Sequence, residues 1–600
     1  MKKTTTSSKL ACVGPRLLLR LHLSSPLTTH LGFIMSASLW SMVLLATATV
    51  AHASPSSSPS AANDGLPIVD LGYQRHKAIS FNETGQYYTF SNIRYAAPPT
   101  GENRFRAPQP PSCAANRAVQ TGETDCICPQ AESWWSLLAA QWLPLFLTGQ
   151  TSFNQSEFVF ATSDSVDVSP ATPDETEDCL FLDVVAPQQI FESRGKGRGA
   201  PVLVWIHGGG YANGHKNSYG NPAGLLARSA NHGSRGVIYV SINYRLGAFG
   251  FLSGPSFQTN GTPNAGLYDQ RFALEWVQKH IRKFGGDPRR VTVAGQSAGG
   301  GSIMHHITAF GGMGGPPPFH KAIPQSPAWQ LMVSNQQQEI IFRDFLDQAN
   351  VSSLADLRAA SSEVLSLANR RQVLSAPYGG FIFGPTVDGH LVPQPPGLLL
   401  LHGHFHRNID LLIGHNAEEG LLFTNPFIQT EEDMLANLDI SLPSSRAWPR
   451  VQDNILTNLY PPVYDGSQNY TSVVARAAAL VGESTFTCNN IYLERAFAGR
   501  TYAYVYAIDP ALHGADASST FFNGETANID TRAEIDVAVA LQEYITSFAD
   551  DGNPNEAGVP FFPLSGPNAT VQTLSLAGIS QMMDEAATDR CRFWQRALYV

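Results

Sequence analysis

A serine flanked by glycines lies between a strand-like and a helix-like segment, and no other feature of the sequence constrains the fold as much. Residues 291–294 form an apolar run, Gly295-Gln296-Ser297-Ala298-Gly299 follows it, and residues 300–309 can continue as a helix. A G-x-S-x-G turn of this kind is sharp and crowded, so it requires small residues two positions from the serine, and it raises the hydroxyl above a sheet. The helix N-terminus behind the turn favours negative charge near the serine. We therefore predict a sheet-and-helix fold in which Ser297 is a nucleophile.

The rest of the chain alternates between the same two kinds of segment. Short apolar runs, typical of buried parallel strands, lie at residues 201–206, 237–242, 409–413 and 501–506. Residues 264–283 are typical of a helix, because their apolar side chains recur on one face. Such alternation predicts an α/β fold with a mostly parallel sheet covered by helices on both faces. No linker-like segment interrupts the chain after residue 63, so residues 54–600 are predicted to form a single domain.

The composition excludes two classes of protein. Hydrophobic residues make up 43% of the chain and charged residues 15%, which excludes a mainly disordered chain. The formal net charge is −10 and no run of Lys or Arg is present, so no nucleic-acid partner is expected.

The N-terminal segment is typical of a targeting signal. Residues 1–53 contain no Asp or Glu, and the apolar stretch 39–46 leads to Ala51-His52-Ala53. An apolar core followed by A-x-A predicts a signal peptide cleaved after Ala53, and hence a secreted, extracellular protein. Met35 is an alternative start codon, in which case residues 1–34 are a gene-model extension. A transmembrane segment is the competing interpretation, but the apolar run is too short and too interrupted by Ser and Thr, so no stable membrane anchor is expected.

Cysteines and glycosylation sequons agree with export. Removal of residues 1–53 takes Cys12 with it and leaves six of the seven cysteines, an even number that suits disulfides in an oxidising compartment. The remaining chain contains N-x-S/T sequons, which predict glycosylation, at Asn82, Asn154, Asn260, Asn350, Asn469 and Asn568.

A second glycine-rich turn, His207-Gly208-Gly209-Gly210-Tyr211, follows the strand-like residues 201–206. The backbone N–H groups of Gly209 and Gly210 can approach a substrate oxygen because no side chain stands in the way, and the N–H of Ala298 is the expected partner donor. Donors placed where negative charge develops each lower the barrier to acyl transfer by roughly 3 kcal/mol. A Walker-type phosphate loop is excluded, because no G-K-[ST] follows the glycines.

Several ordered motifs carry a resemblance to a known family. They are Glu177-Asp178-Cys179-Leu180-Phe181-Leu182-Asp183-Val184, Asn243-Tyr244-Arg245 and Phe284-Gly285-Gly286-Asp287-Pro288. From about residue 90 to residue 595 the chain resembles the type-B carboxylesterase/lipase family, which includes cholinesterases and secreted fungal esterases. The resemblance implies an α/β-hydrolase fold and hydrolysis of carboxylic esters through an acyl-enzyme, with no cofactor.

The resemblance also implies an acid and a base. The stretch Gly414-His415-Asn416-Ala417-Glu418-Glu419-Gly420 is similar to the family pattern G-x-N-x-x-E-G, which makes Glu419 the acid and Glu418 its exposed neighbour. His513, followed by Gly514, matches the family's H-G and is the expected base. The chain order Ser, acid, His is that of α/β-hydrolases. Asp516 remains as an alternative acid.

Alternating histidines raise the question of a metal. His402, His404 and His406 would share one face of a strand, as metal ligands do. No Cys or Asp cluster accompanies them, so no metal is expected.

Two features of the sequence bear on the choice of substrate. Cholinesterases carry Glu, which favours a cationic substrate, where this chain has Gln296, so choline esters are disfavoured. The stretch between Cys128 and Cys179 contains Trp134, Trp135 and Trp142. In the family this loop lies over the active-site gorge, and in some lipases it forms the lid. The alternative is that these aromatic side chains simply pack on the rest of the domain. Either way we expect a small-molecule ester with an apolar acyl or alcohol group. An interfacially activated lipase and a non-catalytic adhesion protein remain as alternatives.

The resemblance implies pairings as well. It implies the disulfides Cys128–Cys179 and Cys488–Cys591, whereas Cys113 and Cys126 are paired by elimination only. It further implies the ion pair Arg245–Asp269, and Arg104–Glu177 is expected as a second pair.

Overall fold

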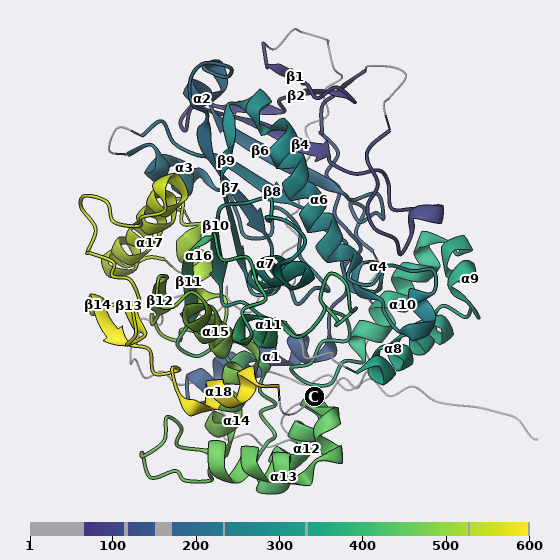
Figure 1. Cartoon of the computed structure of the whole chain (residues 1–600), viewed down its shortest axis with the longest axis vertical. Coiled ribbons are helices and arrows are strands. Elements are labelled where there is room, and N and C mark those ends of the chain that lie inside the picture. Colours follow the sequence, from purple (N-terminus) through teal and green to yellow (C-terminus); the bar gives the residue numbers. More distant parts are fainter. Residues whose placement is uncertain are drawn as a thin grey trace, which may run out of the picture. The chain divides into compact units, whose positions relative to one another are not determined.

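An eleven-stranded mixed sheet runs through the protein (Figure 1). The computed structural model describes residues 65–112, 118–150, 168, 171–231, 234–329, 334–525 and 529–597. The predicted signal peptide, Cys113 and the Asn154 sequon lie outside the described residues, and every described residue belongs to the unit Ser38–Val600.

The sheet is parallel in its centre and antiparallel at both edges. In spatial order its strands are β14 (Gly578–Met583), β13 (Thr570–Ser575), β12 (Tyr502–Tyr506), β11 (Asp410–Asn416), β10 (Lys321–Gln325), β9 (Gly286–Gln296), β7 (Ala200–Ile206), β8 (Ile238–Ile242), β6 (Phe181–Pro187), β4 (Tyr87–Arg94) and β3 (Ser80–Asn82). The strands from β8 to β13 in this order are mutually parallel, and β14, β6, β4 and β3 are antiparallel to their neighbours. A separate small sheet contains β1 (Ile68–Asp70), β2 (Arg75–Lys77) and β5 (Val119–Gln120). The predicted α/β class is confirmed.

The predicted central strands are present, with one clear difference in length. The strand predicted at residues 291–294 is β9, which begins at Gly286. It begins earlier because Gly286 pairs with Ala200 before the register between β7 and β9 shifts. The predicted helix 264–283 is α6, Ala265–His280.

Helices cover both faces of the sheet. Their bounds are α1 (Trp134–Leu147), α2 (Gln188–Glu192), α3 (Ala223–Ser229), α4 (Gly247–Phe251), α5 (Pro255–Gln258), α6, α7 (Ala298–Thr308), α8 (Asn335–Gln348), α9 (Leu354–Ala359), α10 (Ser362–Leu374), α11 (Pro396–Leu401), α12 (Glu431–Ser441), α13 (Pro449–Asp453), α14 (Val473–Gly482), α15 (Cys488–Ala496), α16 (Ala515–Thr520), α17 (Arg532–Asp551) and α18 (Asp589–Gln595). Figure 1 shows α3 and α17 on one side of the sheet and α6 and α7 on the other.

The side chains of β7 point alternately to the two faces of the sheet, and this explains why helices cover both faces. Leu203 and Trp205 pack into a cluster with α3 and α17, whereas Val204 and Ile206 belong to the larger core on the opposite face. Successive side chains of a strand point to opposite faces, so a strand that is apolar throughout has to be buried on both.

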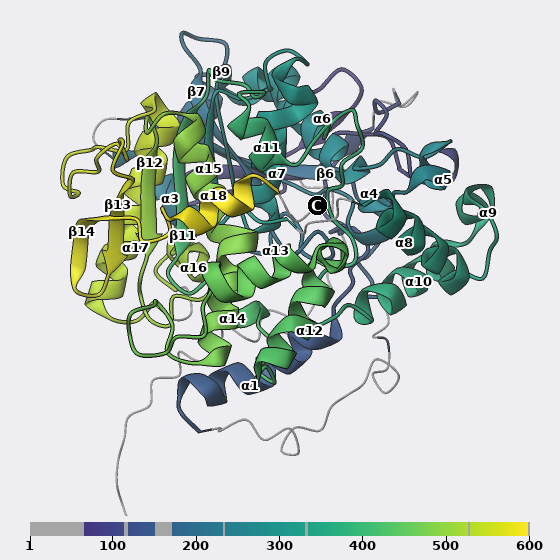
Figure 2. The ribbon, with the colours of Figure 1, turned by 60° about the horizontal axis from the view of Figure 1, so that its bottom comes forward.

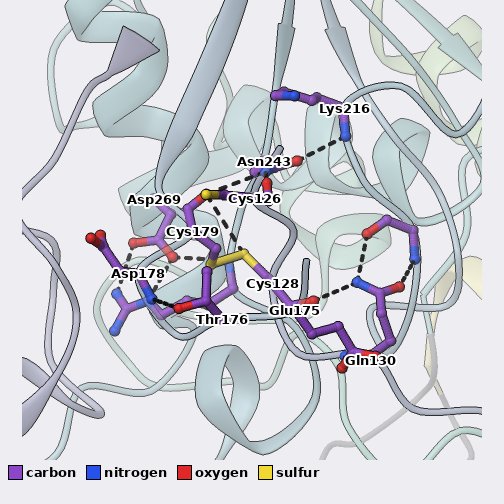
Figure 3. The surroundings of a disulfide bond; sticks show 12 residues. Cys126, Cys128, Gln130, Glu175, Thr176, Asp178, Cys179, Lys216, Asn243 and Asp269 are labelled. Carbon is purple, nitrogen blue, oxygen red and sulfur yellow. Dashed lines mark hydrogen bonds and ion pairs between the residues drawn. A yellow bond between two sulfur atoms is a disulfide. The ribbon is translucent and has the colours of Figure 1, made fainter. Parts of the chain in front are cut away.

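Both disulfides that the family resemblance implies are present. Cys128 is bonded to Cys179, and Cys488 to Cys591. Figure 3 shows the first bridge beside Asn243, whose Nδ2 donates to the carbonyl oxygens of Cys126 (2.8 Å) and Cys179 (3.3 Å). The amide thereby ties the start of the bridged loop to the body.

Cys126 does not form the predicted disulfide bond with Cys113. Cys126 is a free cysteine whose Sγ lies 3.7 Å from the carbonyl oxygen of Thr124. Elimination was the only ground for that pairing, and a count of cysteines carries no information about where the two sulfur atoms lie.

Candidate active site

Ser297 lies in a strained turn between β9 and α7. Its backbone angles are φ 58° and ψ −122°, a conformation that residues with a side chain rarely adopt. A Cβ at Gly299 would lie 2.0 Å from the carbonyl oxygen of Ile206, and one at Gly295 would lie 2.6 Å from the same atom. Glycine is therefore required on both sides of the serine, as the sequence predicted.

Neighbouring strands bring further side chains to the same edge of the sheet. The N–H of Ser297 donates to the carbonyl oxygen of Gln325 at the end of β10 (3.0 Å), and the N–H of Ser326 donates to that of Gly414 in β11 (2.7 Å). The carboxyl ends of β9, β10 and β11 thus meet at one edge, the usual ligand-binding edge of α/β sheets.

Glu419 and His513 are in direct contact. Glu419 Oε2 lies 2.5 Å from His513 Nδ1, and Glu419 Oε1 accepts from the Ser326 hydroxyl and the N–H of Asn416, both at 2.6 Å. Burial opposes ionisation of Glu419, but His513 and these two donors outweigh it and lower the pKa of the carboxyl. Glu419 is therefore a carboxylate that fixes one nitrogen of the ring.

The two other acids do not contact His513. The side chain of Glu418 is exposed. Asp516 is buried, but its carboxyl accepts from the Tyr504 hydroxyl (2.6 Å) and from Asn416 Nδ2 (3.3 Å), and burial raises its pKa. The geometry therefore favours Glu419 over both Glu418 and Asp516 as the partner of the ring.

The pocket that Ser297 lines shares two aromatic residues with the surroundings of His513. Ser297, Phe423 and Phe486 all line it, and the rings of Phe486 and Phe423 lie 4.3 Å and 5.2 Å from the His513 ring, centre to centre. Among the described residues, His513 Nε2 lies 3.3 Å from Gln296 Nε2, and no hydrogen bond links Ser297 to His513. Hydrogen bonds between catalytic groups are often long before the substrate binds.

The glycine turn lies against the serine. A Cβ at Gly208 would lie 3.0 Å from Ser297 Cβ, and Gly210 and Ala298 line the same pocket as Ser297. Within the described part of the chain, the N–H groups of Gly209 and Gly210 donate to no backbone carbonyl. The N–H of Ala298 opens α7 and so has no partner within the helix.

The pocket is lined mainly by aromatic side chains. Its empty space, including the open mouth, is about 940 Å³. The aromatic lining consists of Tyr211, Trp329, Tyr378, Phe381, Phe383, Phe423 and Phe486. Polar side chains on the wall belong to Asn437, Ser484 and Thr485. Such a wall suits a substrate with a sizeable apolar group.

Helix α1, inside the Cys128–Cys179 loop, packs behind this wall. Trp142 is fully buried, its Nε1 donates to the Tyr378 hydroxyl, and Trp135 Nε1 donates to the carbonyl oxygen of Gly380 (2.9 Å). Figure 2 shows α1 beside α12 and α14. Of the two interpretations left open by the sequence, the structure favours aromatics that pack on the body.

The remaining sequence candidates lie apart from the pocket. His402, His404 and His406 follow α11, and no group of three or more metal-ligating side chains occurs among the described residues. Four sequon asparagines are exposed, as a glycan requires: Asn260, Asn350, Asn469 and Asn568. Asn82 is half-buried, with its Nδ2 donating to the Tyr87 hydroxyl (3.1 Å). None of the described helices has the length and apolar character needed to cross a membrane.

Sequence reasoning missed three polar residues of the site. Ser326 and Asn416 hold Glu419, and Tyr219 holds Gln296. The position of Ser326 directly after a parallel strand was an available signal. Tyr219 had none, because only the folded chain brings it to the turn.

Comparisons with known proteins show to which family the chain belongs. The sequence model of the carboxylesterase family matches residues 74–594. Carboxylesterase patB of Penicillium expansum is 42% identical over 544 residues, which are 88% of this chain and 96% of that protein. A secreted lipase of Arthroderma benhamiae is 33% identical over 391 residues, 63% of this chain and 72% of the lipase.

A solved structure extends the likeness to the fold. The crystal structure of Aspergillus niger EstA matches with a TM-score of 0.72 and 26% identity, covering 88% of this chain and 98% of that one. The fold is the α/β-hydrolase fold that the motifs implied. This chain is a carboxylic ester hydrolase and belongs to the carboxylesterase family.

Proposed function

We propose that this protein is a secreted serine esterase that cleaves small-molecule carboxylic esters through Ser297, His513 and Glu419. The contact between Glu419 and His513 beside the pocket that Ser297 lines carries the proposal. Residues 1–53 would leave as a signal peptide, and residues 54–600 would form the single catalytic domain.

His513 acts as the base. Ionised Glu419 accepts from Nδ1–H, which makes Nε2 the ring atom that takes the proton of the Ser297 hydroxyl. The serine oxygen attacks the ester carbonyl, and the imidazolium returns the proton to the leaving alcohol. Water then hydrolyses the acyl-enzyme, with His513 again as base, and releases the acid.

The N–H groups of Gly209, Gly210 and Ala298 stabilise the oxyanion. Each donor of this kind contributes roughly 3 kcal/mol to lowering the barrier. The two glycines leave room for the substrate oxygen.

The aromatic wall selects an apolar acyl or alcohol group. Gln296, a neutral residue beside Ser297, provides no charge to attract a cationic alcohol. The lipase alternative uses the same chemistry and differs in its activation at an interface and its preference for long acyl chains.

Hydrolysis of p-nitrophenyl butyrate and p-nitrophenyl palmitate by the full secreted chain tests the proposal. Ser297→Ala should abolish release of p-nitrophenol from both esters. Ser302→Ala, in the same helix but absent from the pocket lining, is the matched control and should remain active. Activity of Ser297→Ala within tenfold of the parent would overturn the proposal, and strong preference for an emulsified palmitate ester would favour the lipase.

A further inference from the structure

The side chain of Gln296 lies between His513 and Tyr219. Its Nε2 is 3.3 Å from His513 Nε2, and its Oε1 accepts from the Tyr219 hydroxyl at 2.8 Å. Gln296 is 2% exposed, so water does not compete for either end of the amide. Both ends are therefore engaged, one by the ring and one by the phenol.

Neighbouring groups determine where the hydrogens lie. Glu419 can only accept, so His513 Nδ1 carries the hydrogen of the neutral ring and Nε2 is an acceptor. The amide oxygen of Gln296 can only accept, so the Tyr219 hydroxyl donates its proton to Oε1. The amide nitrogen of Gln296 then faces His513 and donates to Nε2.

The N–H of Gln296 stabilises the neutral state of the His513 ring. A hydrogen bond donated to the neutral form of a base opposes its protonation, because the protonated nitrogen would face another N–H. Glu419 at Nδ1 and buried Asp516 attract the proton instead. Phe423 and Phe486, which pack on the ring, carry no charge. Of the contacts that these described residues make with the ring, the one from Gln296 thus favours the neutral imidazole.

We propose that Gln296, oriented by Tyr219, is a positioning residue that holds His513 neutral and correctly placed, and thereby extends ester hydrolysis to lower pH. The inference rests on the proposed function, since it takes His513 as the base. Gln296 acts through His513, because its amide lies 3.3 Å from Nε2, the ring atom that takes the proton.

The pH dependence of kcat/KM for p-nitrophenyl butyrate tests this role. In Gln296→Glu a carboxylate replaces the amide beside Nε2 and favours the imidazolium, so the acid limb of the profile should move up by roughly 1–3 pH units. A purely structural role would lower the rate at every pH and leave the limb in place.

Two tyrosine variants form a matched pair. Tyr219→Phe frees the amide to turn its oxygen towards His513, so the acid limb should move in the same direction by a smaller amount. Tyr239→Phe is the control, because both rings pack on Phe521, at 6.2 Å and 6.3 Å, but only the Tyr219 hydroxyl is bonded to Gln296.

A second substitution at Gln296 keeps the inference testable if the first variant does not fold. If Gln296→Glu does not melt cooperatively, Gln296→Leu, which has no donor, should still show an acid limb above that of the parent. An acid limb at the parental pH in every folded Gln296 variant would overturn the inference. Activity of Ser297→Ala would instead overturn the proposed function, so the two failures are distinguishable.

Discussion

His415 Nε2 lies 3.3 Å from Asp584 Oδ2, and this buried pair joins the strand that leads to Glu419 to the segment directly after β14. Burial alone would lower the pKa of His415, but the Asp584 carboxylate outweighs it and raises the pKa to about 9. The ring is therefore an imidazolium at neutral pH. It contributes stability that is fully present below its unfolded pKa of about 6.5 and is lost as the pH rises through its folded pKa.

We predict that the melting temperature of the protein falls as the pH rises from about 6.5 to 9. Asp584→Asn should remove this His415 contribution, so the variant should be less stable than the parent near pH 6.5 and approach it near pH 9. Thermal unfolding at a series of pH values measures the difference. Equal destabilisation at both ends of that range would contradict the assignment.

The buried pair of Arg245 and Asp269 should be costly to break. Asp269 Oδ2 and Oδ1 accept from Arg245 Nε and Nη2, both at 2.7 Å, and both side chains are almost completely buried. Asp269→Asn leaves a buried guanidinium without its counter-charge, which costs about 3–5 kcal/mol. Urea unfolding measures the loss.

The exposed pair of Arg532 and Asp536 on α17 is the control. Asp536→Asn should change the free energy of unfolding by less than about 1 kcal/mol, because solvent screens the pair. Equal effects of the two substitutions would contradict the importance of burial.

The Cys488–Cys591 bridge spans 103 residues and ties α18 to α15. Cys591→Ser should cost about 4–5 kcal/mol, because the chain-entropy estimate for a loop of this length is large. Urea unfolding measures the cost, and peptide mapping should find Cys128 joined to Cys179 and Cys488 to Cys591. A map that joins Cys126 to Cys128 would refute the pairing.

Gly210 should tolerate no side chain. A Cβ there would lie 2.0 Å from the Phe381 ring, and its φ is 59°. Gly210→Ala should displace the oxyanion donor and reduce kcat by about 10²–10³-fold. Gly197→Ala is the control, because Gly197 also has a positive φ (67°) but a Cβ there meets nothing within 4 Å. An equal loss of activity in both variants would point to backbone strain alone.

The sequence predicted the site best where local patterns determine geometry. The G-x-S-x-G turn needs glycines because the carbonyl oxygen of Ile206, at the end of the adjacent strand β7, fills the space of a Cβ, and the motif itself carries this requirement. Glu419 and His513, which the family resemblance implied, follow successive strands of a parallel sheet, β11 and β12, and therefore lie at one edge.

The sequence could not predict contacts that depend on packing. Tyr219 reaches Gln296 because Trp205 and Phe521 pack around its ring, an arrangement that no local pattern encodes. The position of α1 behind Tyr378 depends on how an internal loop settles on the body. The state of Cys126 likewise depends on which sulfur lies within reach.

The mechanism requires that Ser297 becomes covalently acylated, so trapping this serine with a covalent inhibitor is a decisive experiment. The intact secreted protein, treated with diethyl p-nitrophenyl phosphate and digested, should yield one phosphorylated peptide containing Ser297, with label and loss of esterase activity in equal proportion. Ser297→Ala should take up no label. Complete loss of activity with Ser297 unmodified, or with the label on another residue, would contradict the account.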